Sequence, residues 1–265
     1  EIKECDWSSD VCSSDLETKV MSLRSALLAA TVAVLPIAAQ AQPINGLYVG
    51  IGAGLNVMQQ ENGSIAAIGT SGSQQMSPGA AVVASMGWGF GNGLRAELEG
   101  DFRYNSVKSV SGYGSAFTSA SGKENKYGVM VNALYDFDLG GVMPYVGAGV
   151  GYQQEAVSGI TYTTSTGATA GGSGSKGSFA YQGIVGAALP FSTVPGLALT
   201  ADYRFMGLTG TRSYNATAGG TATTLNSTSN YNHTILVGLR YAFGAPSIAA
   251  PVDTKPVAEI GRAHV

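Results

Sequence analysis

Cysteine, histidine and tryptophan are scarce in this 265-residue chain, with two of each, and only 12% of the residues are charged. Cys5, Cys12, Trp7 and His264 lie near the two ends, so that residues 42–243 contain no cysteine, one histidine and one tryptophan. A structural disulfide, a Cys/His metal site and a Cys/His catalytic pair are therefore excluded from this central part. We expect no cofactor, no metal and no catalytic residue there.

An excess of charge of one sign is also lacking, because residues 42–243 contain nine acidic and nine basic residues. A neutral chain without a basic block gives no support for nucleic-acid binding, and we expect no nucleic-acid partner. No apolar run after residue 41 reaches the length of about 18 residues that a membrane-spanning helix needs. If the chain crosses a membrane, it must cross with strands.

The two ends of the chain are related through their coding. Residues 10–15 (DVCSSD) can be encoded by GAC GTG TGC TCT TCC GAT, and the reverse complement of this string encodes residues 260–265 (IGRAHV). Two ends of a natural protein have no reason to encode opposite strands of one oligonucleotide, whereas a DNA fragment ligated between adapters does. We therefore interpret residues 1–20 and 259–265 as non-native flanks. In the first flank, the translated adapter covers residues 1–16. The alternative is a natural acidic N-terminal tail.

Residues 21–41 (MSLRSALLAATVAVLPIAAQA) have the composition of a secretory signal peptide. Arg24 supplies the positive start, residues 26–39 are apolar, and residues 39–41 (AQA) form a small-residue cleavage pattern. The apolar stretch is short and contains Pro36, which disfavours a membrane-spanning helix. We expect the exported protein to begin directly after the cleavage pattern.

Alternation with a period of two residues predicts eight β-strands in residues 42–243. The segments are about 46–57, 79–90, 94–104, 126–137, 144–153, 179–189, 197–206 and 231–243. Short turns alternate with long connections centred on 58–78, 105–125, 154–178 and 207–230, whose Ser, Thr and Gly content suggests flexible, solvated loops. The fold predicted for residues 42–243 is all-β, an eight-stranded antiparallel up-and-down transmembrane β-barrel.

The two faces of each strand indicate the surroundings of this barrel. In segment 94–104, apolar residues alternate with five charged residues, and segments 197–206 and 231–243 follow the same rule. Charges inside and apolar residues outside suit a lipid bilayer, provided that the charges form ion pairs. The predicted interior ion-pair residues are Arg95, Glu97, Glu99, Asp101, Arg103, Lys126, Asp136, Asp202, Arg204 and Arg240. Outward aromatic residues gather near both ends of the strands, as two membrane interfaces would select.

Glycine is abundant, with 38 residues, and occupies every second position in YVGIGAG (48–54) and YVGAGVG (145–151). We expect these glycines to face a narrow lumen and to leave room for large charged side chains. The alternative, a nucleotide-binding fingerprint, is disfavoured because the spacing is G-x-G-x-G and no helix follows.

Four segments resemble the N-terminal barrel domain of OmpA-like outer-membrane proteins of Gram-negative bacteria: PYVGAGVGY (144–152), FAYQGIVGAALPF (179–191), LTADYRFMGL (199–208) and YNHTILVGLRYAF (231–243). The resemblance implies that Tyr241 and Phe243 form the signal recognised by the outer-membrane barrel assembly machinery. It also implies that the Pro/Ala-rich linker at 244–258 leads to a peptidoglycan-binding domain that is missing from this chain.

We expect a monomeric, non-enzymatic barrel that supports envelope integrity in the outer membrane. Its partners are expected to be outer-membrane lipids and lipopolysaccharide, and its lumen is expected to be filled by a polar plug. The alternatives are a narrow-pore porin with a gated ion path and a surface adhesin or receptor. A lipid A deacylase would need a serine two residues after His233, where this chain has Ile235. His233 is then expected to be an interfacial residue.

Overall fold

The structure, a computed structural model, describes residues 43–66, 69–113, 117–228 and 230–245. The expected flanks, the expected signal peptide and the linker beyond residue 245 lie outside the described residues. In the ranges that are described, no helix is long and apolar enough to cross a membrane.

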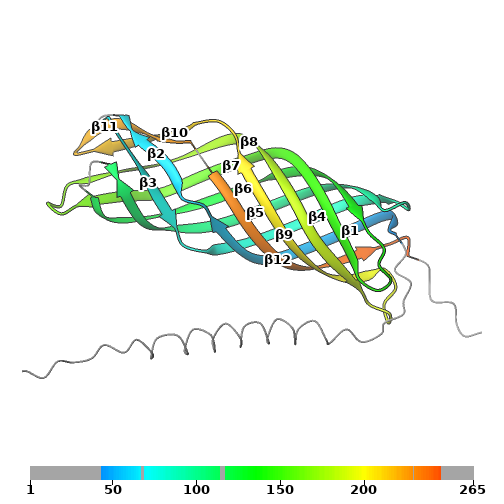
Figure 1. The fold of residues 1–265 in the computed structure, drawn as a ribbon. Helices are drawn as coiled ribbons and strands as arrows, with labels where there is room; N and C mark the ends of the chain where they lie inside the picture. Colours follow the sequence, from blue (N-terminus) through cyan, green and yellow to red (C-terminus); the bar gives the residue numbers. More distant parts are fainter. Residues whose placement is uncertain (1–42, 67–68, 114–116, 229, 246–265) are drawn as a thin grey trace, which may run out of the picture. The chain divides into compact units, whose positions relative to one another are not determined.

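Twelve β-strands form one antiparallel sheet in the described residues (Figure 1). Eight of them cover the predicted segments, apart from residues 137 and 243 at the ends of two segments: β1 (Asn45–Met58), β4 (Gly79–Phe90), β5 (Leu94–Gly112), β6 (Phe117–Asp136), β7 (Met143–Thr164), β8 (Thr169–Pro190), β9 (Leu197–Leu208) and β12 (Asn230–Ala242). Four shorter strands lie in the connections that were expected to be loops: β2 (Glu61–Ile65), β3 (Thr70–Met76), β10 (Arg212–Ala218) and β11 (Thr221–Ser227). The prediction of an all-β antiparallel barrel is confirmed, and the predicted number of eight strands is too low.

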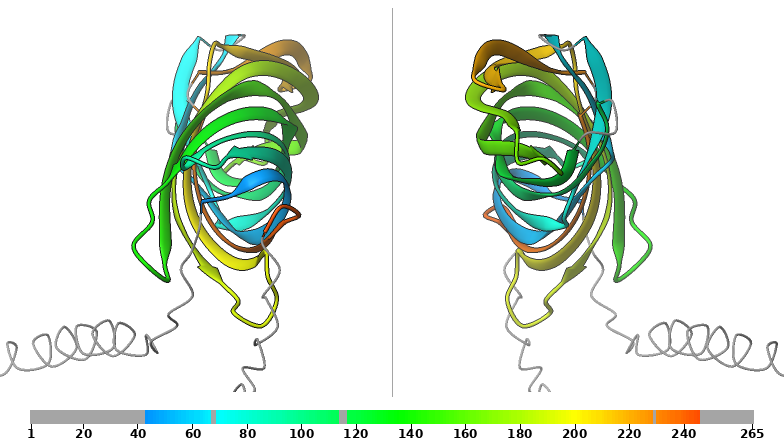
Figure 2. Two further views of the ribbon diagram at one scale, coloured as in Figure 1. Left: turned by 90° about the vertical axis from the view of Figure 1, so that its right-hand side faces the viewer. Right: turned by 90° about the vertical axis from the view of Figure 1, so that its left-hand side faces the viewer.

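Strand pairing produces two connected rings. In the first ring, which we call the lower barrel, β1, β4, β5, β6, β7, β8, β9 and β12 pair in this order, and β12 pairs with β1. Beyond the lower barrel, only the long strands β5 to β8 continue. There the short strands take the places of β1, β4, β9 and β12, through the pairs β5–β3, β3–β2, β2–β11, β11–β10 and β10–β8. We call this second ring the upper barrel. The end-on views in Figure 2 show the strands wrapped around one common axis.

The upper barrel closes less evenly than the lower one. The ladder between β5 and β6 ends at Ser106 and Lys123. On the other side, β8 pairs with β9 as far as Ala180 and resumes pairing, with β10, only at Gly172. The expected long loops are therefore mostly strand, because their backbone groups pair with one another whatever the side chains are.

Side chains of the lower barrel alternate between buried and exposed. On β5, Leu98 is 55% exposed, whereas Glu97 and Glu99 are 7% and 0% exposed. The exposed apolar side chains lie between two groups of exposed aromatic residues. The lower aromatic belt, near the short turns, contains Trp88, Phe90, Tyr135, Phe137, Tyr241 and Phe243, and the upper aromatic belt contains Phe102, Tyr127, Tyr152, Phe179, Tyr181 and Tyr203. This arrangement fits a bilayer around the lower barrel.

Glycines of β7 make room for side chains of β6, although these are not the charged ones that were expected. A Cβ atom on Gly147 would lie 2.8 Å from Leu134 Cγ, and one on Gly151 would lie 2.6 Å from Met130 Sδ. Leu134 and Met130 are both buried inside the barrel. Gly147 and Gly151 therefore admit bulky apolar residues into the lumen between the layers of charge.

Candidate functional site

The interior of the barrel buries the ten charged residues that the sequence pattern predicts, nine in the lower barrel and Lys126 at its border with the upper barrel. They extend from β5, β6, β9 and β12, and the most exposed of them, Asp202, is only 9% exposed. Charges that are buried to this degree destabilise a protein unless they are paired and hydrogen-bonded. Their partners therefore decide whether the lumen is a stable plug.

At the lower end, Arg95 is the central cation. Its Nη2 atom lies 2.8 Å from Asp136 Oδ1, and its Nη1 atom lies 3.9 Å from Glu97 Oε2. The Tyr48 hydroxyl accepts a hydrogen bond from Arg95 Nη1 and donates one to Glu97 Oε2, each 3.0 Å long. The guanidinium also lies between the rings of Tyr48 and Tyr145, 5.2 and 5.1 Å from their centroids. This cation thus has contacts from four strands.

At mid-height, Glu99 and Arg204 form an ion pair between β5 and β9. Arg204 Nη2 also lies 3.1 Å from Asp202 Oδ2. Asn132 Nδ2 donates a 2.7 Å hydrogen bond to Glu99 Oε2, and Gln182 Nε2 donates a 2.7 Å hydrogen bond to Asn132 Oδ1. This layer spans the lumen from one wall to the other.

Other predicted charges pair within one strand. Asp101 pairs with Arg103 on β5, and Gln153 Nε2 donates a 2.6 Å hydrogen bond to Asp101 Oδ2. Arg240 has no carboxylate partner among the described residues, and its guanidinium lies 6.0 Å from the centroid of the Tyr145 ring. The interior charges thus combine pairs across the lumen with pairs between neighbours.

The upper barrel contains a second charged cluster that the sequence pattern did not predict. Glu61, Glu124 and Glu155 converge on the amide of Asn230, whose Nδ2 atom lies 3.4, 3.0 and 2.7 Å from their respective oxygens. Lys126, which was predicted to lie inside, pairs with Glu124. Arg212 is the second cation, and it lies 3.3 Å from Glu61 and 3.1 Å from Glu155. Three acids thus face two cations.

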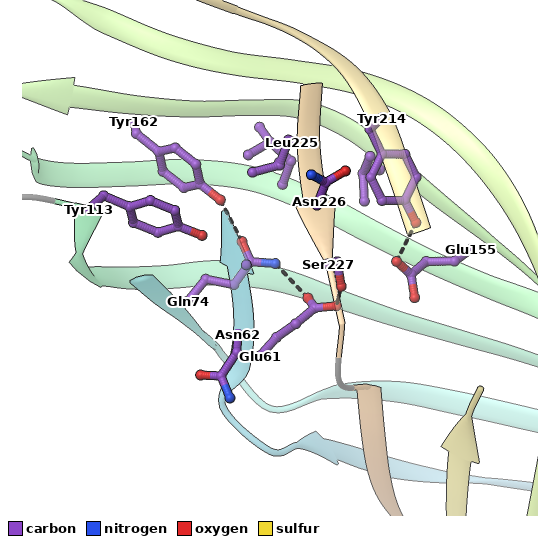
Figure 3. A pocket seen from close by; sticks show the side chains of 13 residues that line it. Glu61, Asn62, Gln74, Tyr113, Glu155, Tyr162, Tyr214, Leu225, Asn226 and Ser227 are labelled. Carbon is purple, nitrogen blue, oxygen red and sulfur yellow. Dashed lines mark hydrogen bonds between the residues drawn. The ribbon is translucent and has the colours of Figure 1, made fainter. Parts of the chain in front are cut away.

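Glu61 lies among polar partners inside the upper barrel, as Figure 3 shows for Gln74 and Ser227. Gln74 Nε2 donates a 2.6 Å hydrogen bond to Glu61 Oε2, and Tyr162 donates a 2.8 Å hydrogen bond to Gln74 Oε1. Ser227 donates to the other oxygen of Glu61. Burial raises the pKa of Glu61 from 4.5 to about 8, and the neighbouring charges of Glu124 and Glu155 add to this rise. Glu61 is therefore a proton-binding group near neutral pH.

Apolar and aromatic side chains fill the upper barrel beyond these charges. Tyr113, Ile160, Tyr162, Tyr214 and Leu225 belong to one buried cluster, and the rings of Tyr113 and Tyr162 stack with their centroids 5.7 Å apart. The cavity that they share with Glu61 has a volume of about 10 Å³, and the cavity beside Arg95 and Arg204 has about 30 Å³. Cavities of this size hold roughly one or two water molecules.

The predicted assembly-signal residues lie at the end of the last strand. Tyr241 is 38% and Phe243 is 58% exposed, and their rings meet edge to face with centroids 5.0 Å apart. His233 lies at the opposite end of β12, where its Nδ1 atom lies 2.7 Å from the Tyr203 hydroxyl and its Nε2 atom 2.9 Å from Gln59 Nε2. No group of His, Cys, Asp or Glu in the described ranges is arranged as a metal site.

An antiparallel barrel with an apolar belt outside and paired charges inside defines the class of transmembrane β-barrels. The chain belongs to the family described as outer membrane protein beta-barrel domain, whose sequence profile matches residues 25–243. This match confirms the resemblance to OmpA-like outer-membrane barrels and identifies the chain as an outer-membrane protein of a Gram-negative bacterium.

An outer membrane protein of Gluconacetobacter diazotrophicus is 39% identical to this chain in an alignment of length 244, which covers 84% of this chain and 64% of that protein. The chain thus spans slightly less than two thirds of the length of this relative. Among solved structures, Neisserial surface protein A is 18% identical with a TM-score of 0.45, and the alignment covers 75% of this chain and 98% of that one. The outer membrane protein OprG from Pseudomonas aeruginosa is 12% identical with a TM-score of 0.47, covering 75% and 97%. These structural similarities concern the fold alone.

Proposed function

We propose that this protein is a structural, non-enzymatic barrel that supports envelope integrity, and that the eight strands of its lower barrel cross the outer membrane as a closed wall. The observation that carries this proposal is the layer formed by Glu99, Arg204, Asn132 and Gln182, which bridges the lumen at mid-height. The adjoining cavity of about 30 Å³ is too small for a continuous water-filled path. The lumen therefore acts as a polar plug and not as a pore.

Single-channel recording in planar bilayers tests the plug. The native protein should show no stable conductance, whereas the variant Glu99→Ala/Arg204→Ala, which removes the bridging layer, should conduct. The variant Asp138→Ala serves as a control because it removes an exposed charge in the short turn between β6 and β7, outside the lumen. Large, stable conductance of the native protein would overturn the plug and favour the narrow-pore porin.

The envelope role rests on the ends of the barrel. The Pro/Ala-rich linker at 244–258 would tether the barrel to a periplasmic peptidoglycan-binding domain of the whole protein, and Tyr241 with Phe243 would direct assembly of a monomer into the membrane. Deletion of the gene should make cells more sensitive to detergents, and expression of the whole protein should restore resistance. Unchanged detergent sensitivity in the deletion strain would contradict this role.

A second candidate function is that of a surface adhesin or receptor. The specific observation in its favour is that β2, β3, β10 and β11 build an ordered surface beyond the upper aromatic belt. Replacing the exposed residues of the β10–β11 turn, Gly219 and Gly220, by a longer Gly/Ser loop should then abolish binding to host cells or phage while the heat-modifiable gel mobility of the folded barrel is kept. Unaltered binding would exclude this turn from recognition.

A further inference from the structure

Exposed charge is distributed unevenly over the described residues. Asp138, in the short turn between β6 and β7, is the only exposed acid there, because all other described acids are buried. The exposed bases are Lys108, Lys123 and Lys176, and all three lie beyond the upper aromatic belt. The described surface at the upper end of the barrel therefore presents positive charge that no exposed carboxylate offsets.

Lys108 and Lys123 form a pair on neighbouring strands. Lys123 is the backbone partner of Ser106, two residues before Lys108, and the two Cα atoms are therefore about 8 Å apart. Lys108 occupies a bulge, since the β3 partner of Val107 is Met76 while Ser109 pairs with Gln75. A bulge turns the extra side chain out of the regular pattern, and Lys108 is exposed whereas Asn105 below it is buried.

Both lysines lie beyond the upper aromatic belt. Lys108 lies six residues beyond Phe102 on β5, and Lys123 lies four residues beyond Tyr127 on β6. With a rise of about 3.3 Å per residue and a strand tilt of about 40°, the two lysine backbones lie about 10 to 15 Å beyond the aromatic rings. Aromatic belts mark the boundary between the acyl chains and the head groups, so that both ammonium groups reach the layer of charged head groups.

We propose that Lys108 and Lys123 form a docking site for the phosphate groups of lipopolysaccharide in the outer leaflet. The proposal rests on the proposed function, because it requires the upper barrel to face outward from the outer membrane. Two flexible cations on one patch can hold one phosphate between them or two phosphates of one headgroup, and no exposed acid in the described residues competes with the ligand. The site thus anchors the barrel laterally to its own lipid.

Binding of fluorescent lipopolysaccharide to the detergent-refolded chain tests the proposal. Each surface lysine near an anionic lipid layer contributes about 1 kcal/mol, so the variant Lys108→Gln/Lys123→Gln should bind about 30-fold more weakly. The variant Lys108→Arg/Lys123→Arg should keep most of the affinity. Lipopolysaccharide whose phosphates have been removed enzymatically should not distinguish the two proteins. Its affinity for the native protein should be as low as its affinity for the glutamine variant.

Lys176→Gln is the charge-matched comparison. The backbone partner of Lys176 on β7 is the buried Glu155, so that Lys176 occupies a position on the lumen-facing side of β8, away from the proposed pair. This variant should lose less than about fivefold, the effect of one surface lysine. Equal affinity of the native and glutamine-pair proteins, or equal loss in Lys176→Gln and the pair variant, would overturn the site. Heat-modifiable mobility and bilayer recordings of the same preparations report separately on the barrel and its plug, and so distinguish failure of the proposed function.

Discussion

The free energy of unfolding of the barrel should fall as the pH rises from 4.5 to 8, because of Glu61. In the folded protein, burial raises the pKa of this carboxyl to about 8, whereas in the unfolded chain it returns to about 4.5. Between these values the folded state binds one proton more than the unfolded state, so stability is lost with rising pH at about 1.4 kcal/mol per pH unit. Over the whole window, Glu61 alone accounts for a loss of about 5 kcal/mol.

Urea titrations in detergent micelles at pH 5, 6.5 and 8 measure this loss, with the emission of Trp88 and the far-ultraviolet circular dichroism as signals. Glu61→Gln removes the proton-binding group, so that the stability of this variant should depend much less on pH than that of the native protein. The slope against pH is the readout, since the substitution also alters the hydrogen bond with Gln74. Asp138→Asn, an exposed site, should keep the native slope. If the native protein gains stability toward pH 8, or if Glu61→Gln keeps the native slope, the buried cluster does not hold the extra proton.

Two further predictions concern the lumen and the last strand. Arg204→Met leaves Glu99 and Asp202 buried without their cation and should lower the free energy of unfolding by about 3–5 kcal/mol in urea titrations. Adding Glu99→Gln to this variant should recover part of the lost stability, and no recovery would contradict the pairing. Phe243→Ala should reduce the amount of folded protein in the outer membrane of expressing cells but not the yield of refolding in detergent, and equal membrane yields would exclude Phe243 from the assembly signal.

The lower barrel is predictable from the sequence because its rule is local. Leu94 to Tyr104 alternate strictly, and each residue reports its own face without knowledge of its partners. The ten interior charges follow from that alternation, and all are buried. Their pairing is not local: Glu99 and Arg204 are 105 residues apart in the chain, and the register that joins β5 to β9 through β6, β7 and β8 leaves no mark on either residue.

The upper barrel was missed because its composition resembles that of loops. Ser, Thr and Gly make up four of the seven residues of β3 and, likewise, of β11, and these residue types are typical of solvated connections. A signal was nevertheless present in the alternation of Arg212, Tyr214 and Ala216, all of which are buried, and in the spacing of two residues between Glu124 and Lys126. What no local pattern contains is the convergence of Glu61, Glu124 and Glu155 on Asn230, because it depends on four strands at once.

The continuation of β5 to β8 past the bilayer turns the upper barrel into a stem. Twelve residues of β7 separate Tyr152, in the upper aromatic belt, from the last strand residue, Thr164. At about 3.3 Å per residue and a tilt of about 40°, this length lifts the strand tips about 30 Å above the belt. With the upper barrel facing outward, as the proposed function requires, peptides inserted at the exposed turn of Gly219 and Gly220 would be presented above the lipid head groups on a β-sheet support, within reach of antibodies. The upper barrel would then serve as a scaffold for surface display.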